Sequence, residues 1–421
     1  MIETLLWIYI IVCLSLIFFQ CVFIAITTLR SYIDHLIVQR KIRIIIRQLE
    51  RIATKKPIED KHQAFLKSKL ISTSSLYRYE AALRKVLEKI ENGTLSLRDP
   101  DEITNVTIHI RHRAIKDEEK SRGRSKIKMR LRPKKALILP LPKDVADRYF
   151  REYIRQTAPN IVSLTSTYRK RDDIIHLFYV YMLKKYGYLQ HCQTSELIAN
   201  LRDLLDTGDT VCAEGVMLAV YQIGDPELVI TALKQVDKKN RFLHPKIISD
   251  GLLSFTGNAN TLQNLFLDQL SDFSVDMQVN LLNYLRFASG AHCERVLQLL
   301  QNNAISDAVH FSCIRYLGKY PYEPAFELLA HFASGASGRR IEYEIVALTT
   351  LRRYPCQKTI DILCAQINNP SWFIRYNATE SLESLGIEYQ DLVDIFDGTD
   401  RFARDMLQYQ FDQRYILDEE V

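Results

Sequence analysis

One aliphatic position recurs at nearly constant spacing through the second half of this 421-residue chain. The recurring residues, 30 to 34 positions apart, are Ile223, Leu253, Leu285, Leu317, Leu351 and Leu385. Three residues before each of them stand Val220, Asp250, Leu282, Ile314, Leu348 and Leu382, of which only Asp250 is not aliphatic. Such a period is typical of stacked helical pairs, in which each pair completes the core of its neighbours. The chain also has only 14 glycines and 12 prolines, which argues against a turn-rich sandwich. We therefore predict an all-α protein in which residues 136–421 form a repeat domain.

Turn residues separate these helices, for example at Gly224-Asp225-Pro226 and Asn369-Pro370-Ser371. After the second turn, Ile374-Arg375, Ala378, Leu382 and Leu385-Gly386 follow in the order of a HEAT-repeat signature, which residues 357–386 therefore resemble. Leu317-Gly318 resembles a second repeat end, whereas the other repeats lack the arginine and hold Leu243, Val275, Asp307 and Ile341 there. The resemblance covers about residues 140–395. It implies a HEAT-like α-solenoid, a fold that mostly binds other macromolecules and only occasionally carries an enzyme.

Residues 4–29 contain no charged side chain. As a helix they would extend about 39 Å, enough to cross a hydrocarbon core of about 30 Å. A cleaved signal peptide would need a basic start and a shorter apolar run, but Met1-Ile2-Glu3 has no basic residue. Residues 1–29 are therefore predicted to be an uncleaved, single-pass transmembrane anchor.

Basic residues dominate the region after this anchor. Residues 30–56 hold eight Lys and Arg against Asp34 and Glu50, which predicts an N-terminus outside and the bulk of the chain in the cytoplasm. Residues 1–135 carry a net charge of +14 and residues 136–421 a net charge of −8. Residues 30–135 are thus predicted to be a basic cytoplasmic juxtamembrane region, with helices over 30–56 and 76–92.

Two interpretations of this region remain open, a solvated extension of the anchor and a surface that contacts anionic lipid. Residues 105–135, with a net charge of +9, would be a hairpin with one basic face or a disordered loop. The candidate membrane-contact residues are Arg40, Lys41, Arg43, Arg47, Arg51, Arg122, Arg124, Lys126, Lys128, Arg130 and Arg132. No aromatic residue interleaves the cations of residues 111–135, which argues against nucleic acid as the partner.

The candidate partner-binding residues are Trp372, Arg375 and Tyr376. Each has a structural alternative, because the arginine could tie neighbouring repeats and the aromatic residues could belong to the core. Arg286, Arg352 and Arg353 follow the recurring aliphatic residues and are interpreted as a solvated helix face.

Motifs for known chemistry are missing from the sequence, including phosphate-binding loops, nucleophile elbows and zinc-protease helices. The loop 334–340 could cradle a phosphate, but an ordinary turn explains its glycines equally well. We expect no cofactor, no metal and no enzymatic activity. The predicted function is a membrane-tethered scaffold that binds a protein partner such as a membrane enzyme or an envelope-biosynthesis complex. The alternative is an enzyme or nucleic-acid-acting protein on a HEAT scaffold, and the oligomeric state stays open.

Overall fold

The computed structural model describes residues 2–98, 138–239 and 243–419. Over these ranges the chain is almost entirely helical, with one short antiparallel pair of strands, which confirms the predicted all-α class. The predicted basic segment 105–135 lies outside the described residues. The chain divides into two compact units, Met1–Gly208 and Asp209–Val421.

The first unit contains short helices packed around the C-terminal part of one long helix. Its elements are α1 (Ile2–Ala53), α2 (Asp60–Lys69), α3 (Thr73–Glu91), β1 (Ser96–Arg98), β2 (Ile138–Pro140), α5 (Lys143–Val162), α6 (Thr165–Arg169), α7 (Asp173–Lys185), α8 (Tyr188–His191) and α9 (Ser195–Thr207). The two strands pair with Leu97 opposite Leu139. They therefore bring residues on either side of the segment 99–137 together.

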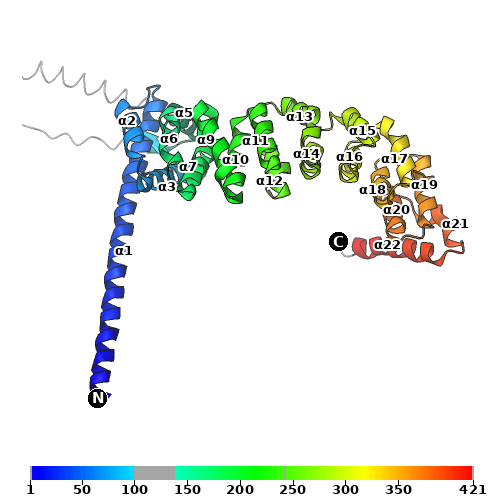
Figure 1. Ribbon diagram of the computed structural model, residues 1–421, viewed down its shortest axis with the longest axis horizontal. Coiled ribbons are helices and arrows are strands. Elements are labelled where there is room, and N and C mark those ends of the chain that lie inside the picture. Colours follow the sequence, from blue (N-terminus) through cyan, green and yellow to red (C-terminus); the bar gives the residue numbers. More distant parts are fainter. Residues whose placement is uncertain (1, 99–137, 240–242, 420–421) are drawn as a thin grey trace, which may run out of the picture. The chain divides into compact units, whose positions relative to one another are not determined.

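Helix α1 runs for 52 residues, and neither glycine nor proline interrupts it (Figure 1). From Leu14 to Leu29 its side chains are exposed, and Phe18 and Phe23 are each about two-thirds accessible. An exposed run of large apolar side chains is unfavourable in water and favourable in lipid. The helix is long and apolar enough to cross a membrane.

The C-terminal part of α1 belongs to the core of the first unit. Ile42, Ile45, Leu49 and Ile52 repeat at helical spacing and are buried where α1 packs against α3 and α5. Asp34 accepts hydrogen bonds from Arg78 of α3, with Nε at 2.9 Å. The helix predicted over residues 30–56 is therefore confirmed as far as Ala53, and α1 continues into it from the apolar stretch.

Helices from both sides of the boundary predicted at residue 136 pack together in this unit. Helix α5 contacts α1, α2 and α3, and its Tyr153, Ile154 and Ile161 are buried. The helix predicted over residues 76–92 is confirmed as α3, which ends at Gly93 with a positive φ of 62°. The described residues that follow the predicted boundary, from Ile138 to Gly208, thus belong to the same compact unit as residues 30–98.

The second unit is a succession of short antiparallel helices. Its elements are α10 (Thr210–Ile223), α11 (Pro226–Lys238), α12 (Pro245–Ser249), η1 (Gly251–Ser254), α13 (Ala259–Asp268), η2 (Leu270–Asp272), α14 (Val275–Ala288), α15 (Cys293–Gln301), α16 (Asp307–Lys319), η3 (Glu323–Ala325), α17 (Phe326–Ala333), α18 (Ile341–Leu351), α19 (Gln357–Ile367), α20 (Trp372–Ser384), η4 (Tyr389–Leu392), α21 (Val393–Phe396) and α22 (Arg401–Glu419).

These helices form two layers. Helices α12, α14, α16, α18 and α20 pack successively in one layer, while α15, α17 and α19 each pack against the helix that follows in the chain. Polar ties join neighbouring repeats: the Tyr354 hydroxyl donates to the carbonyl of Leu317 at 3.0 Å, and Ser381 donates to the carbonyl of Leu348. The arrangement is compatible with a helical solenoid.

The predicted repeat register is wrong by one residue in the second repeat. Leu253 is half exposed, whereas Leu252 is buried at 1% accessibility, and three residues earlier the buried side chain is Ser249 rather than Asp250. The reason is that α12 has only five residues and passes into the tighter 3₁₀ turn η1, which changes the angular position of each side chain. At the other recurring positions Ile223, Leu285, Leu317 and Leu351 are buried and Leu385 is partly buried.

The turn predicted at Gly224-Asp225-Pro226 is confirmed. Gly224 ends α10 with φ of 78°, and the Asp225 side chain caps α11 by accepting from the amide of Glu227 at 3.0 Å. The next interhelix turn approaches closely here, since a Cβ on Gly257 would lie 2.0 Å from the carbonyl oxygen of Gly224. Glycine is therefore required at position 257 for these two turns to pack.

Candidate binding surfaces

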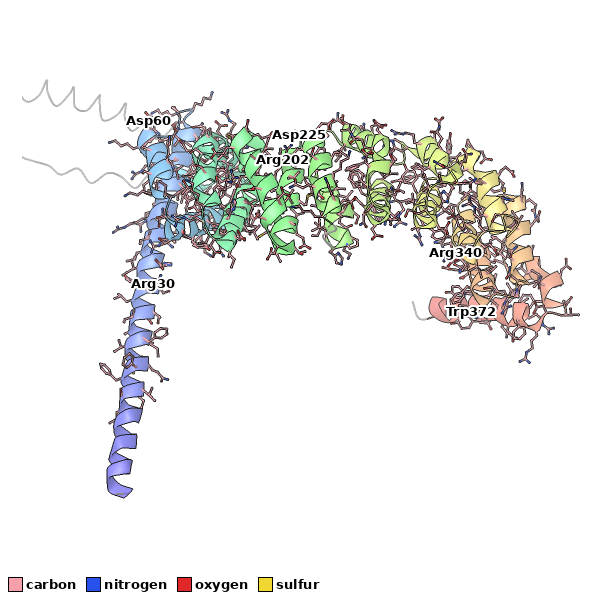
Figure 2. The ribbon with its side chains drawn as sticks, viewed as in Figure 1. Arg30, Asp60, Arg202, Asp225, Arg340 and Trp372 are labelled. Atoms are coloured by element: carbon pink, nitrogen blue, oxygen red, sulfur yellow. The ribbon has the colours of Figure 1, made fainter. Side chains whose placement is uncertain are left out.

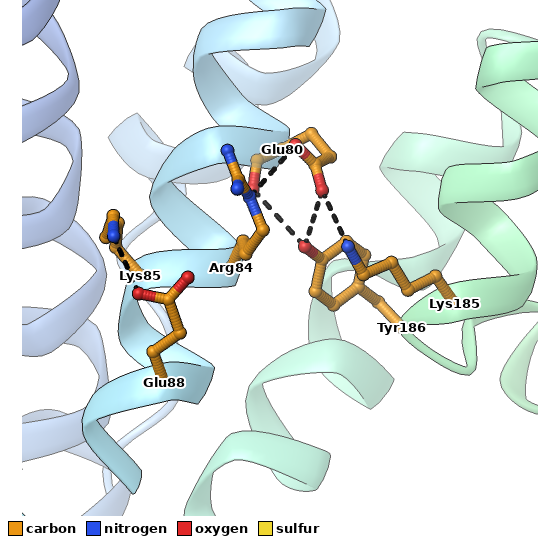
Figure 3. Close-up of polar contacts among 6 residues, drawn as sticks. All are labelled: Glu80, Arg84, Lys85, Glu88, Lys185 and Tyr186. Atoms are coloured by element: carbon orange, nitrogen blue, oxygen red, sulfur yellow. Dashed lines mark hydrogen bonds and ion pairs between the residues drawn. The ribbon is translucent and has the colours of Figure 1, made fainter. Parts of the chain in front are cut away.

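A buried carboxylate joins α3 to α7 in the first unit (Figure 3). Glu80 accepts from Lys185 Nζ and from the Tyr186 hydroxyl, both at 3.0 Å, and Arg84 lies 3.9 Å away. Burial and the carboxylate together raise the pKa of the Tyr186 hydroxyl, which therefore stays protonated and donating. Because every polar group here has a partner, we interpret this cluster as a structural tie.

A chain of buried hydroxyls ends at a histidine in the same unit. His62 Nε2 lies 2.9 Å from the Tyr153 hydroxyl, which contacts Tyr79 at 3.1 Å, and Tyr79 contacts Tyr188 at 3.2 Å. Burial raises the pKa of all three tyrosines and lowers that of His62 to about 4. At neutral pH all four side chains of this network are therefore uncharged. A buried polar network must be uncharged to avoid a desolvation penalty.

The five predicted membrane-contact residues on α1 do not share one environment. Arg40, Arg43 and Arg47 are exposed, and Arg51 is partly exposed and pairs with Glu59 at 3.6 Å. Lys41 is instead buried at 8% accessibility, with its ammonium group 4.7 Å from the centre of the Phe65 ring. Lys41 therefore contributes to the protein core and offers little charge to a membrane surface. The other six residues, between Arg122 and Arg132, lie outside the described range.

The predicted partner-binding residues lie in the first turns of α20, whose first residue, Trp372, is labelled in Figure 2. Trp372 is 50% exposed and stacks on Tyr376 with their ring centres 5.1 Å apart. Phe373, Phe402 and Tyr409 are also more than half exposed. We name these five residues, Trp372, Phe373, Tyr376, Phe402 and Tyr409, the aromatic patch. Next to it, a hollow of about 290 Å³ is lined by side chains of α20 and α22.

Arg375 contacts the backbone beside this patch. Its Nη1 donates to the carbonyl of Asn369 at 2.8 Å, and its guanidinium lies 5.5 Å from the centre of the Phe402 ring. The first contact fixes the turn between α19 and α20, and the second joins α20 to α22. The structure thus gives Arg375 stabilising contacts, while its predicted role in partner binding stays a prediction.

Sequence reasoning missed a hollow of about 610 Å³ in the second unit, between the C-terminal ends of α14, α16 and α18. Its floor includes the apolar side chains of Phe287, Ile345 and Val346. Five cationic side chains surround them, and we name this feature the basic groove: Arg286, Arg315, Lys319, Arg352 and Arg353. None of the residues that line the groove is acidic.

Little local negative charge balances the groove. Residues 209–421 contain 28 Asp and Glu against 18 Lys and Arg, so the five cations gather on an otherwise acidic unit. Among the described side chains, Arg352 has an ion-pair partner, Glu380 at 3.6 Å, and the other four groove cations have none. Burial and the nearby Arg315 lower the pKa of Arg286, whose Nε is buried without a hydrogen-bond acceptor. The groove is therefore suited to an anionic ligand.

A signal for this groove is present in the sequence. Arg286, Lys319 and Arg352 are spaced 33 residues apart, which matches the repeat length. The predicted solvated helix face contains Arg286, Arg352 and Arg353 as one set of residues. Arg315 and Lys319 are not part of it, because they stand on either side of Leu317-Gly318 instead of directly after the recurring leucine.

The glycine-rich loop 334–340 forms a turn in which Arg339 contacts buried side chains, while its second arginine, Arg340, is exposed and pairs with Glu342. Arg339 donates to the Tyr343 hydroxyl at 2.8 Å and lies 3.1 Å from His310 Nδ1, while Gly335 and Gly338 have positive φ values. These contacts hold the Arg339 guanidinium away from a phosphate above the loop. In the part of the chain that the structure describes, no three His, Cys, Asp or Glu side chains are grouped to hold a metal ion.

Comparison with known proteins finds no family model that matches this chain and no curated protein with significant similarity to it. The proposed function therefore rests on the sequence and the geometry of this chain.

Proposed function

We propose that this protein is a membrane-anchored scaffold in which α1 spans the bilayer and the helical units bind a protein partner. The partner would be of the kind that works at a membrane, such as a membrane enzyme or an envelope-biosynthesis complex. The observation that carries the proposal is the continuity of α1, which passes from an exposed apolar stretch into the core of the first unit. A chain built in this way keeps its folded part next to the bilayer.

We further propose that the repeats are of the HEAT type and that residues after the anchor lie in the cytoplasm. The first point is supported by the helical pairs of the second unit and by the signature at Ile374-Arg375. The second is supported by the basic flank of residues 30–56.

Contact with anionic lipid depends on the tilt of α1. Along an α-helix, Arg40 lies about 16 Å and Arg51 about 33 Å beyond Leu29. Both distances exceed the Debye length of about 8 Å at physiological salt. On a steep helix Arg30 is therefore the cation nearest to the headgroups, and contact by Arg40, Arg43 and Arg47 requires that α1 lean towards the surface.

Anchoring can be tested with a double variant, Phe18→Arg and Phe23→Arg. Each arginine near the middle of the apolar stretch costs about 3 kcal/mol of insertion free energy, so the variant should leave the membrane fraction. Ile174→Arg is the matched control, because Ile174 is 74% exposed on α7 and outside the apolar stretch. A double variant that stays in the membrane fraction as the parent does would refute the anchor.

Orientation can be tested through Cys356, which is exposed, unlike Cys212, which is buried. A membrane-impermeant thiol reagent should leave Cys356 unlabelled in intact cells and label it after lysis. Labelling without lysis would place the second unit outside.

The scaffold function can be tested by placing a photo-crosslinking residue at Phe373, in the aromatic patch. We expect an adduct with one membrane-associated protein, and no such adduct from a crosslinker at Ile174. A purified chain that converted a substrate without another protein would contradict the proposal.

A further inference from the structure

The basic groove presents its cations in a row across three consecutive repeats. Arg286 belongs to α14, Lys319 is the last residue of α16, and Arg352 directly follows α18. These three helices are neighbours in one layer. Neighbouring packed helices are about 8–10 Å apart, so equivalent positions on them form a row with steps of about that length.

A peptide in the extended polyproline II conformation advances about 3.1 Å per residue with three residues per turn, so every third side chain faces the same way, about 9 Å apart. A peptide that crosses the three helices would meet a groove cation with about every third side chain. Arginine and lysine form charge-assisted hydrogen bonds with carboxylates, and arginine can form two at once. We propose that the basic groove binds an extended acidic segment of the protein partner, with Asp or Glu at about every third position. This inference rests on the proposed scaffold function and names the chemistry of the segment that the scaffold holds.

The remaining groove residues fit the same occupant. Phe287 is half exposed and lies beneath two of the cations, with Lys319 Nζ 4.8 Å and the Arg286 guanidinium 5.0 Å from its ring centre. These contacts hold the charged groups over an apolar floor. Between the acidic positions of a bound segment, small or apolar side chains would lie against Ile345 and Val346. The row extends over about 18 Å, which is longer than a single phosphate group could bridge.

The close packing of α16 on α18 maintains the groove. At Gly318 a Cβ would lie 3.0 Å from Thr350 Oγ1 and 3.2 Å from its methyl group, so glycine permits this approach. Thr350 in turn donates to the carbonyl of Ile314 at 3.4 Å. A larger residue at position 318 would separate the helices and lengthen one step of the cation row.

The test measures fluorescence anisotropy of labelled peptides with the full chain in neutral detergent micelles. One peptide carries Glu at every third position of a Gly/Ser background, and a second has the same composition with its Glu residues contiguous. The groove variant replaces Arg286, Lys319 and Arg352 by Gln. The control variant replaces Lys234, Arg295 and Lys358 by Gln; these cations are paired with Asp272, Asp268 and Glu327 on other helices. Both variants therefore change the net charge equally.

We expect the spaced peptide to bind the parent, and the groove variant to bind it at least ~10-fold more weakly while the control variant stays within ~2-fold. The contiguous peptide should bind the parent more weakly than the spaced one. Thermal unfolding of the two triple variants should be similar, since none of the replaced cations is fully buried.

Three results would overturn the inference. The first is equal weakening in the groove and control variants, which would indicate long-range attraction only. The second is equal binding of the two peptides, and the third is displacement of the peptide by inorganic tripolyphosphate at the same concentration of charge. Failure of the scaffold proposal is distinguishable, because the peptide assay in micelles is independent of membrane insertion and of the aromatic patch.

Discussion

Acid should destabilise the first unit through His62, which is buried at 6% accessibility beside Tyr153. Burial lowers the pKa of this imidazole from 6.5 to about 4, because the charged form loses its hydration. Above pH 6.5 neither the folded nor the unfolded chain holds the proton. As the pH falls from 6.5 towards 4, the unfolded chain binds a proton that the folded chain does not accept, so the free energy of unfolding decreases over this window.

The gap between the two pKa values corresponds to about 3 kcal/mol once the pH lies below both of them. About 2 kcal/mol of this is already lost between about pH 7 and about pH 5. The variant His62→Phe keeps a ring of similar size but cannot titrate. It gives up one hydrogen bond, worth about 1 kcal/mol, at every pH.

Hydrogen–deuterium exchange can follow α2 and α5 separately from the second unit in the full chain. After correction for the intrinsic exchange rate, protection of residues 60–69 and 143–162 should fall from about pH 7 to about pH 5 more in the parent than in His62→Phe. Both proteins contain the other buried titratable groups, including His176, so the contribution of these groups cancels in the comparison. Burial lowers the pKa of His176 as well. An equal loss of protection in both proteins would refute the assignment to His62.

Four further perturbations test the packing and the aromatic patch. Leu348→Asp places a charge at a fully buried position of α18 and should cost at least about 3 kcal/mol, visible as a lower melting temperature, whereas Leu348→Met should cost less than about 1.5. Glu80→Ala removes the acceptor of the buried Tyr186 hydroxyl and of the solvent-accessible Lys185, and should lower the free energy of chemical unfolding by about 1 to 2 kcal/mol; an unchanged midpoint would contradict the contact between α3 and α7. Arg375→Ala should lower the melting temperature, because two carbonyl contacts of the turn are lost. Trp372→Ala should leave the melting temperature nearly unchanged and abolish the crosslink at Phe373; persistence of the crosslink would remove Trp372 from the interface.

The features that were predictable from the sequence depend on local chemistry. The apolar composition of residues 4–29 and the absence of glycine and proline up to Ala53 are sufficient to predict one long helix. Likewise, Gly224-Asp225-Pro226 carries a helix end, a cap and a helix start in three residues. Side chains such as Leu285 and Leu317 were placed correctly in the core because regular helices preserve the period.

The features that were not predictable depend on how segments meet. The burial of Lys41 requires Phe65 of α2 above it, and the half exposure of Leu253 requires the 3₁₀ turn after α12. The basic groove is visible only when α14, α16 and α18 lie side by side, because its cations come from three helices and are separated by 33 residues. The composition alone indicates an acidic surface, because the net negative charge of residues 136–421 conceals the local positive charge of the groove.

In the proposed anchored arrangement, the uninterrupted course of α1 would also fix how the first unit is turned relative to the apolar stretch of this helix. A helix turns by about 100° per residue, and no glycine or proline separates the exposed Phe23 from the packed Ile42. Inserting two residues near Ile33 would swing the first unit by about 200°, whereas seven residues, close to two full turns, would nearly restore its facing and lift it by about 10 Å. In that arrangement α1 would determine which side of the first unit faces a neighbour bound to its apolar stretch, as well as keep the unit at the membrane.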